Sequence, residues 1–184
     1  MSTSIPTVRH IAHFANQVGQ VGLPQALRNL GIGDVVGRPA EQVLGVLTDY
    51  FCPHGGTIDE AIARDAWEKT IEAVIDQGIT DIATLTPEQW QGIIADFITN
   101  SIETKVINDI GTEINRLPTD VTAINQLQAE LHTTIRGAVD DAIGNSLGAG
   151  QMLSQTNIDS ITRDIYEGAF AFMSELTSEE TSNE

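Results

Sequence analysis

Four residues in the first third of the chain have side chains that could bind a transition metal. His10 and His13 lie three positions apart in a predicted helix, and Cys52 and His54 form a Cys-x-His pair. Imidazole nitrogens and thiolates are preferred zinc ligands, and two such pairs could converge on one tetrahedral ion. Strong zinc signatures have tighter, doubled cysteine spacings, so we expect packing or surface roles here and no metal or other cofactor. A small metal-binding helical protein stays open as a minor alternative.

The catalytic motifs in the chain lack the structural context that they need. Gly144-Asn145-Ser146-Leu147-Gly148 has the letters of a hydrolase nucleophile elbow, but that elbow requires a strand that ends at the serine. The residues before Ser146 follow a helical pattern, and the glycines indicate the end of a helix. No G-x-x-x-x-G-K sequence occurs, and Lys69 and Lys105 are the only lysines from which a phosphate site could be built. With His132 expected at the surface, the sequence predicts no catalytic residue and no enzyme.

A row of four carboxylates occupies one face of a predicted helix. They lie three or four residues apart, and only Arg64 and Lys69 relieve their mutual repulsion. One interpretation is a solvated face. The other is a docking surface for a basic partner, because acidic surfaces steer association with cationic ones. The residues predicted to bind a partner are Asp65, Glu68, Glu72 and Asp76.

The net charge of the chain is unevenly distributed. The 184 residues include 26 acidic and 9 basic ones, for a formal net charge of −17. Residues 1–56 are neutral, so residues 57–184 carry all of the excess acid. Such a surface repels the phosphate backbone, which argues against direct nucleic-acid binding through a basic groove. It leaves open a second function, in which the chain mimics nucleic acid and inhibits a DNA-binding enzyme.

Cysteine content and hydropathy indicate the cellular setting. A single cysteine forms no internal disulfide, which is typical of a reducing compartment. The chain has no signal-peptide pattern at its start and no apolar run long enough for a transmembrane helix. We therefore expect a cytoplasmic protein that does not bind a membrane.

Helix signals recur along the chain, and strand signals are nearly absent. Apolar residues repeat every three to four positions rather than every two. Thr57-Ile58-Asp59-Glu60 and Thr86-Pro87-Glu88-Gln89 are capping boxes, in which two side chains satisfy free amides of a first helical turn. These signals predict long helices over about 57–77, 86–110, 121–143 and 157–176, and shorter ones over 4–18, 24–30 and 39–51.

The predicted fold is all-α, a bundle of about four long helices with shorter N-terminal helices. We expect three parts: a neutral short-helix segment over 1–56, an acidic long-helix bundle over 57–176 and a disordered acidic tail over 177–184. Trp67 and Trp90 are expected in the core rather than at an interface. The predicted buried face of the helix after Thr57 consists of Ile58, Ala61, Ile62, Ala66, Ile71, Val74 and Ile75.

Three segments combine helix caps and turns in an order that is similar to a known family. They are Gly37-Arg38-Pro39-Ala40-Glu41, the run from Cys52 to Arg64 (CPHGGTIDEAIAR), and Leu85-Thr86-Pro87-Glu88-Gln89 with the helix from Ile98 to Gly111. Over about residues 8–145 the chain resembles the B component of the Qat anti-phage defence systems. Members of that family look longer and begin with a Gly/Ser/Pro-rich segment. The chain is thus expected to be their C-terminal helical portion or a divergent member.

The resemblance implies a bacterial, non-enzymatic subunit that works beside an ATPase, a nuclease-like protein of the TatD type and a QueC-like component. The QueC-like component is the expected direct partner, with an N-terminal arm of the B component as its possible protein substrate. No catalytic residue of the family maps onto this chain, which agrees with the failure of the catalytic motifs.

Overall fold

The structure is a computed structural model, and it describes residues 4–52, 56–113, 121–146 and 155–179. In these ranges the chain forms seven α-helices and two short 3-10 turns and no strand, which confirms the predicted all-α fold. The elements in chain order are α1 (Ser4–Val21), α2 (Leu23–Asn29), η1 (Gly33–Val35), α3 (Ala40–Phe51), α4 (Ile58–Asp76), η2 (Ile82–Thr84), α5 (Pro87–Glu113), α6 (Val121–Ser146) and α7 (Gln155–Glu179).

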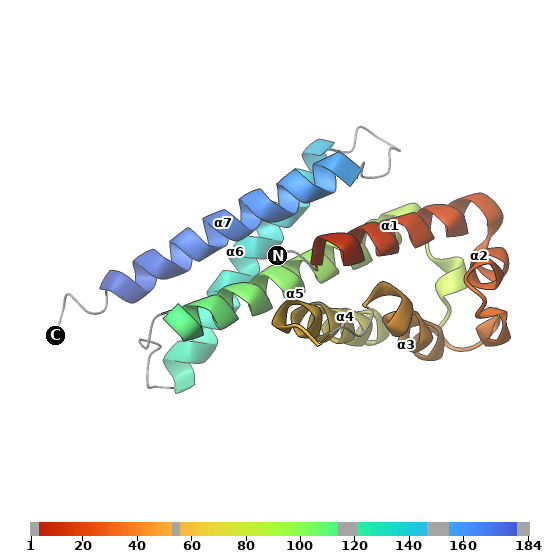
Figure 1. Ribbon diagram of the computed structural model, residues 1–184, viewed down its shortest axis with the longest axis horizontal. Helices are drawn as coiled ribbons and strands as arrows, with labels where there is room; N and C mark the ends of the chain where they lie inside the picture. Colours follow the sequence, from red (N-terminus) through yellow and green to blue (C-terminus); the bar gives the residue numbers. More distant parts are fainter. Residues whose placement is uncertain (1–3, 53–55, 114–120, 147–154, 180–184) are drawn as a thin grey trace.

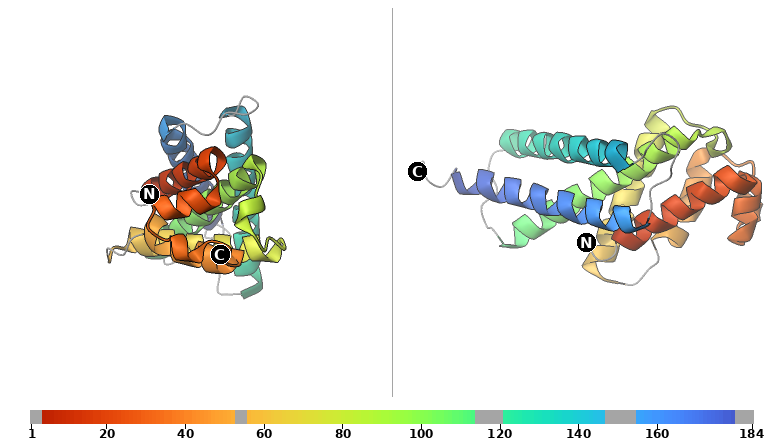
Figure 2. Two further views of the ribbon diagram at one scale, coloured as in Figure 1. Left: turned by 90° about the vertical axis from the view of Figure 1, so that its right-hand side faces the viewer. Right: turned by 90° about the horizontal axis from the view of Figure 1, so that it is seen from above.

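Helix α5 is the central element, because α1, α4, α6 and α7 all pack against it. Figure 1 shows α2 and α3 at one end of the molecule, with α6 and α7 extending to the other. In Figure 2, α6 and α7 lie side by side along α5. The amide of Asn100 in α5 donates to Thr70 Oγ1 in α4 (3.3 Å), and Thr104, one turn later, donates to Asp65 (3.1 Å). Because the order reverses, α4 runs antiparallel to α5.

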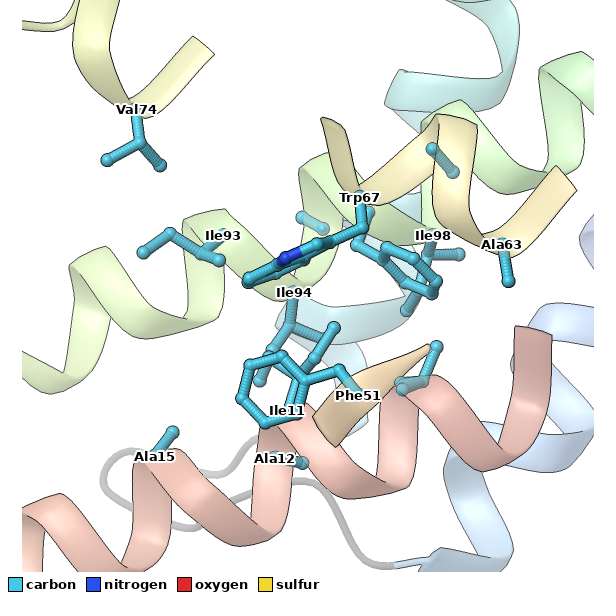
Figure 3. Close-up of a cluster of buried hydrophobic side chains, with 14 of the residues drawn as sticks. Ile11, Ala12, Ala15, Phe51, Ala63, Trp67, Val74, Ile93, Ile94 and Ile98 are labelled. Atoms are coloured by element: carbon cyan, nitrogen blue, oxygen red, sulfur yellow. The ribbon is translucent and has the colours of Figure 1, made fainter. Parts of the chain in front are cut away.

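A chain of buried aromatic rings joins four helices into one core. Phe14 of α1 meets Phe51 of α3 with ring centroids 5.7 Å apart, and Phe51 meets Trp67 of α4 edge-on at 5.0 Å. Trp67 in turn lies 6.4 Å from Phe97 of α5. Edge-to-face packing of this kind adds to the free energy gained by burying the rings. Figure 3 shows Trp67 and Phe51 within this cluster. The neutral and acidic parts of the sequence therefore share one hydrophobic core.

Two capping boxes fix the starts of α4 and α5, as the sequence predicts. The Thr57 main-chain N–H donates to Glu60 Oε2 (2.8 Å), and the Glu60 N–H donates back to Thr57 Oγ1 (3.2 Å). The Thr57 main-chain hydrogen bond also lowers the pKa of Glu60. Thr86 and Gln89 make the same reciprocal pair at 2.9 and 3.3 Å. Four amides that lack helical partners are thus satisfied at the two helix starts.

The prediction for the buried face of α4 is wrong at three positions. Ile58 is 67% exposed, Ile75 is 37% exposed and Ala61 is also exposed. The face of α4 that carries Trp67 is turned toward the core, and Trp67 is fully buried. Its large ring offers more apolar area for burial than any aliphatic side chain. Ala63 and Thr70 are buried with Trp67, together with the correctly predicted Ile62, Ala66 and Val74; Ile71 is half-buried.

The predicted apolar stripe of α5 is confirmed, and the helix ends later than expected. All eight predicted residues are buried: Trp90, Ile93, Ile94, Phe97, Ile98, Ile102, Val106 and Ile110. The helix continues past Ile110 to Glu113. Helix α7 likewise reaches Glu179, so residues 177–179 of the expected disordered tail are helical, and residues 180–184 lie outside the described ranges.

Candidate functional site

The four predicted partner-binding carboxylates lie on α4, and two side-chain contacts hold the first of them, Asp65. Asp65 Oδ2 accepts from Lys69 Nζ at 2.9 Å and from Thr104 Oγ1 of α5 at 3.1 Å. Lys69 Nζ also donates to Thr104 Oγ1 at 3.2 Å. Asp65 therefore serves partly to attach α4 to α5, and its charge is paired on its own helix.

Glu68 is also close to a cation of its own helix. Its Oε1 lies 3.9 Å from Arg64 Nε, at the outer limit of an ion pair. Arg64 makes a closer ion pair with Asp49 of α3 (2.8 Å) and donates to the Cys52 carbonyl (3.4 Å). The guanidinium thus joins the end of α3 to α4, and Glu68, whose side chain is 63% exposed, is only weakly compensated.

Glu72 and Asp76 form the uncompensated half of the acidic row. Both are exposed, and within the described ranges neither makes an ion pair or a side-chain hydrogen bond. Asp76 is the last residue of α4, where the helix dipole also disfavours a negative charge. Counting Arg64 and Lys69 with the four carboxylates leaves a net charge of −2 on this face. We call these four carboxylates the acidic face of α4.

The opposite side of α4 anchors the helix firmly, so the acidic face has a rigid support. Trp67 Nε1 donates to the Leu44 carbonyl of α3 (3.4 Å), and Thr70 donates to the Ala66 carbonyl (2.8 Å). The amide of Asn100 then donates to the Thr70 hydroxyl. These contacts satisfy polar groups on the buried side, and those of Trp67 and Asn100 join α4 to α3 and α5.

A second charged cluster, which the sequence analysis did not identify, joins α4, α5 and α7. Lys105 Nζ lies 2.7 Å from Asp109 and 3.7 Å from Asp59, and the Tyr166 hydroxyl of α7 donates to Asp109. Burial alone would raise the pKa of Asp109, but the hydrogen bonds from Lys105 and Tyr166 lower it. Burial alone would lower the pKa of Lys105, whereas Asp109 and Asp59 raise it. Only the Lys105–Asp109 spacing of four residues could have pointed to this cluster.

The candidate metal ligands are not gathered into a site by the described residues. His10 and His13 are exposed on α1, and the His10 ring lies 6.2 Å from the Tyr50 ring. Cys52 is buried, and its thiol lies 3.5 Å from the Ala63 carbonyl oxygen. Burial raises the pKa of Cys52 to about 11, which disfavours the thiolate that a metal requires. His54 is outside the described ranges, and no group of three or more metal-binding side chains occurs within them.

The other side chains considered for catalysis or phosphate binding lie in ordinary structural surroundings. Ser146 is the last residue of α6, so the chain before it is helix rather than the strand that a nucleophile elbow requires. His132 is exposed on α6, with its Nδ1 2.8 Å from Glu103 of α5. Lys69 and Lys105 both serve in the contacts described above.

The comparison with protein families identifies the kind of protein that has this fold. A family model described as "Qat anti-phage system associated protein QatB" matches residues 1–173. The chain belongs to the QatB family. The match confirms the resemblance inferred from the caps and turns, and it extends beyond residues 8–145 at both ends. No curated protein and no solved structure matches the chain.

Membership of the QatB family makes the chain a component of an anti-phage defence system. A Qat defence system has several components, of which this chain is one. Within the described ranges, no helix combines the length and the hydropathy that a bilayer-spanning segment needs.

Proposed function

We propose that this QatB-family chain is a non-enzymatic subunit that binds a protein partner through the acidic face of α4. The expected partner is the QueC-like component of the same system, and the chemistry that it must present is a cationic surface. The single observation that carries the proposal is the exposed, unpaired state of Glu72 and Asp76. Unpaired surface carboxylates attract and orient a cationic partner at little desolvation cost.

The arrangement of α4 supports a binding role over a merely solvated one. Asp65 and Glu68 lie beside Lys69 and Arg64, so their charges are partly screened within the chain. Glu72 and Asp76 extend the same face without such partners. Since the buried side of α4 is fixed by Trp67, this face can be presented without rearrangement of the helix.

Co-expression of the chain with the other Qat components tests the proposal. We expect a tagged chain to recover the QueC-like component in a stoichiometric complex that survives nuclease treatment. Recovery of the chain alone would contradict the proposal. If added duplex DNA displaced the partner in proportion to its concentration, a nucleic-acid mimic would be the better description.

A further inference from the structure

We propose that the exposed side of α4 binds a cationic amphipathic helix of the protein partner, with Ile58 and Ile75 contacting apolar residues at the two ends of that helix. Both isoleucines are large apolar side chains left exposed on α4, at 67% and 37%. Ile58 is the first residue of α4, and Ile75 is the last but one. The inference rests on the proposed function, and it adds apolar contacts and a shape to a partner described so far by its charge.

The two isoleucines lie on the same side of α4 as the acidic face. Successive residues of an α-helix are about 100° apart, so Ile58 and Ile75 both lie within about 60° of the direction opposite the buried residues. Glu68 and Glu72 lie within about 20° of that direction. Ala61, which is also exposed, lies between Ile58 and the carboxylates. The exposed side of α4 therefore has an apolar residue near each end, with three of its four carboxylates between them.

The fold gives no reason for isoleucine at either position. An exposed side chain contributes little hydrophobic stabilisation to the folded chain. Isoleucine is also a poorer helix former than alanine, because its branched Cβ loses rotamer freedom in a helix. The apolar area of Ile58 and Ile75 gains free energy only when a partner removes it from water. A binding role therefore explains what folding does not.

The charges on the exposed side of α4 decide among the possible occupants. Counting Arg64 and Lys69, the acidic face has a net charge of −2, and Glu72 and Asp76 make no ion pair within the described ranges. A second copy of this chain would place carboxylates against carboxylates, and an anionic membrane or a nucleic acid would be repelled in the same way. A protein segment that carries cations between two apolar residues complements this surface.

The length and shape of the surface fit a helix of the partner. Ile58 and Ile75 are seventeen residues apart in one helix, which corresponds to about 25 Å along the axis of α4. A second helix of about five turns packed alongside α4 would match that length. Because Trp67 fixes the buried side of α4, the spacing of the two isoleucines is set before the partner binds.

The first test uses the isolated chain and two synthetic helical peptides of about 18 residues, the length of the surface. One peptide carries lysines along the middle of one face and a leucine at each end of that face. In the other, glutamine replaces both leucines, so the charge is the same. We expect the leucine peptide to bind about ten-fold more tightly in fluorescence anisotropy. The double variant Ile58→Ala with Ile75→Ala should remove this difference.

Val46→Ala is the matched control for the peptide comparison. Val46 lies on α3 and is 40% exposed, close to the exposure of Ile75, so its variant should keep the difference between the two peptides. Equal binding of the two peptides to the wild type, or an unchanged difference in the double variant, would overturn the inference. This comparison uses no Qat component, so it can fail independently of the proposed function.

The second test uses the complex obtained by co-expression. Ile58→Ala should weaken partner binding by about ten-fold and Ile75→Ala, which removes a less exposed side chain, by about three-fold. Neither variant should lower the melting temperature, because alanine favours the helix. Val46→Ala should bind within about two-fold of the wild type.

The outcomes of the second test separate this inference from the proposed function. If reversal of Glu72 and Asp76 weakens binding while Ile58→Ala and Ile75→Ala bind as the wild type does, the proposed function stands and this inference is wrong. If the isolated chain self-associates and Ile58→Ala makes it monomeric, a second copy occupies the exposed side of α4, and the inference of a cationic partner helix is wrong.

Discussion

Charge reversal of Glu72 and Asp76 should weaken partner binding while the fold stays intact. The double variant Glu72→Lys with Asp76→Lys changes the charge of the acidic face from −2 to +2, counting Arg64 and Lys69, because each reversal adds two charges. Each reversal replaces an attraction of about 0.5 kcal/mol by a repulsion of similar size, as is typical of exposed pairs. About 2 kcal/mol in total corresponds to a roughly 30-fold weaker complex.

The same variant should be slightly more stable than the wild type. Asp76 is the last residue of α4, where lysine interacts favourably with the helix dipole, by about 0.5 kcal/mol. Binding and stability are thus expected to change in opposite directions. A loss of binding caused by misfolding would change both in the same direction.

The assay is a titration of the purified partner by calorimetry at low and high salt, with Glu130→Lys and Asp141→Lys in α6 as the matched control. Both control residues are exposed, and reversing them also changes the net charge from −17 to −13, since each reversal adds two charges. The control should bind within about two-fold of the wild type. Equal weakening in both variants would show that total charge matters rather than the acidic face of α4. Unchanged binding in both would show that Glu72 and Asp76 do not contribute to partner binding.

Four further outcomes are expected from the described contacts. Thr57→Ala should cost about 1 kcal/mol of stability in urea unfolding, because α4 loses its N-cap. Tyr166→Phe should cost about 1 kcal/mol by the same measurement, because Asp109 loses a hydrogen bond from α7. Folding lowers the pKa of Asp109, so the stabilisation of the fold by its ionised carboxylate is present above pH 3.8 and disappears as the pH falls through the lowered pKa. The melting temperatures of wild type and Asp109→Asn should therefore differ above pH 3.8 and converge at pH values below the lowered pKa. The Cys52 thiol, with a pKa of about 11, should react with iodoacetamide at pH 8 only after unfolding.

Local signals in the sequence were sufficient for the helices and for most of the core. The capping boxes at Thr57 and Thr86 depend on residues three positions apart, and they form as predicted. The prediction of the apolar stripe of α5 is correct because other helices surround this helix and bury its large apolar residues in the core. Such features are decided within a few turns of chain.

The orientation of α4 could not be read from its sequence. Apolar residues occur on more than one side of this helix, so Ile58 and Ile75 looked as well placed for burial as Val74. The contact of Phe51 of α3 with Trp67 decides which face of α4 is buried. A contact between two helices of this kind has no signature in the spacing of either one.

The sequence predicted that the four carboxylates lie on one helix, but not which residues pair with them. The sequence placed Asp65, Glu68, Glu72 and Asp76 on one face and gave Arg64 and Lys69 as the nearby cations. It could not show that Thr104 of α5 holds Asp65, or that Asp49 of α3 holds Arg64. Those tertiary contacts make Glu72 and Asp76 the unpaired half of the face.

Amide hydrogen exchange of the chain, alone and in complex with the proposed QueC-like partner, shows most directly whether a partner binds α4. We expect the complex to slow exchange in the segment of α4 from Asp65 to Asp76, because a bound partner covers the acidic face and suppresses local opening of this helix. Protection confined to α6 and α7, with α4 exchanging as in the free chain, would contradict it.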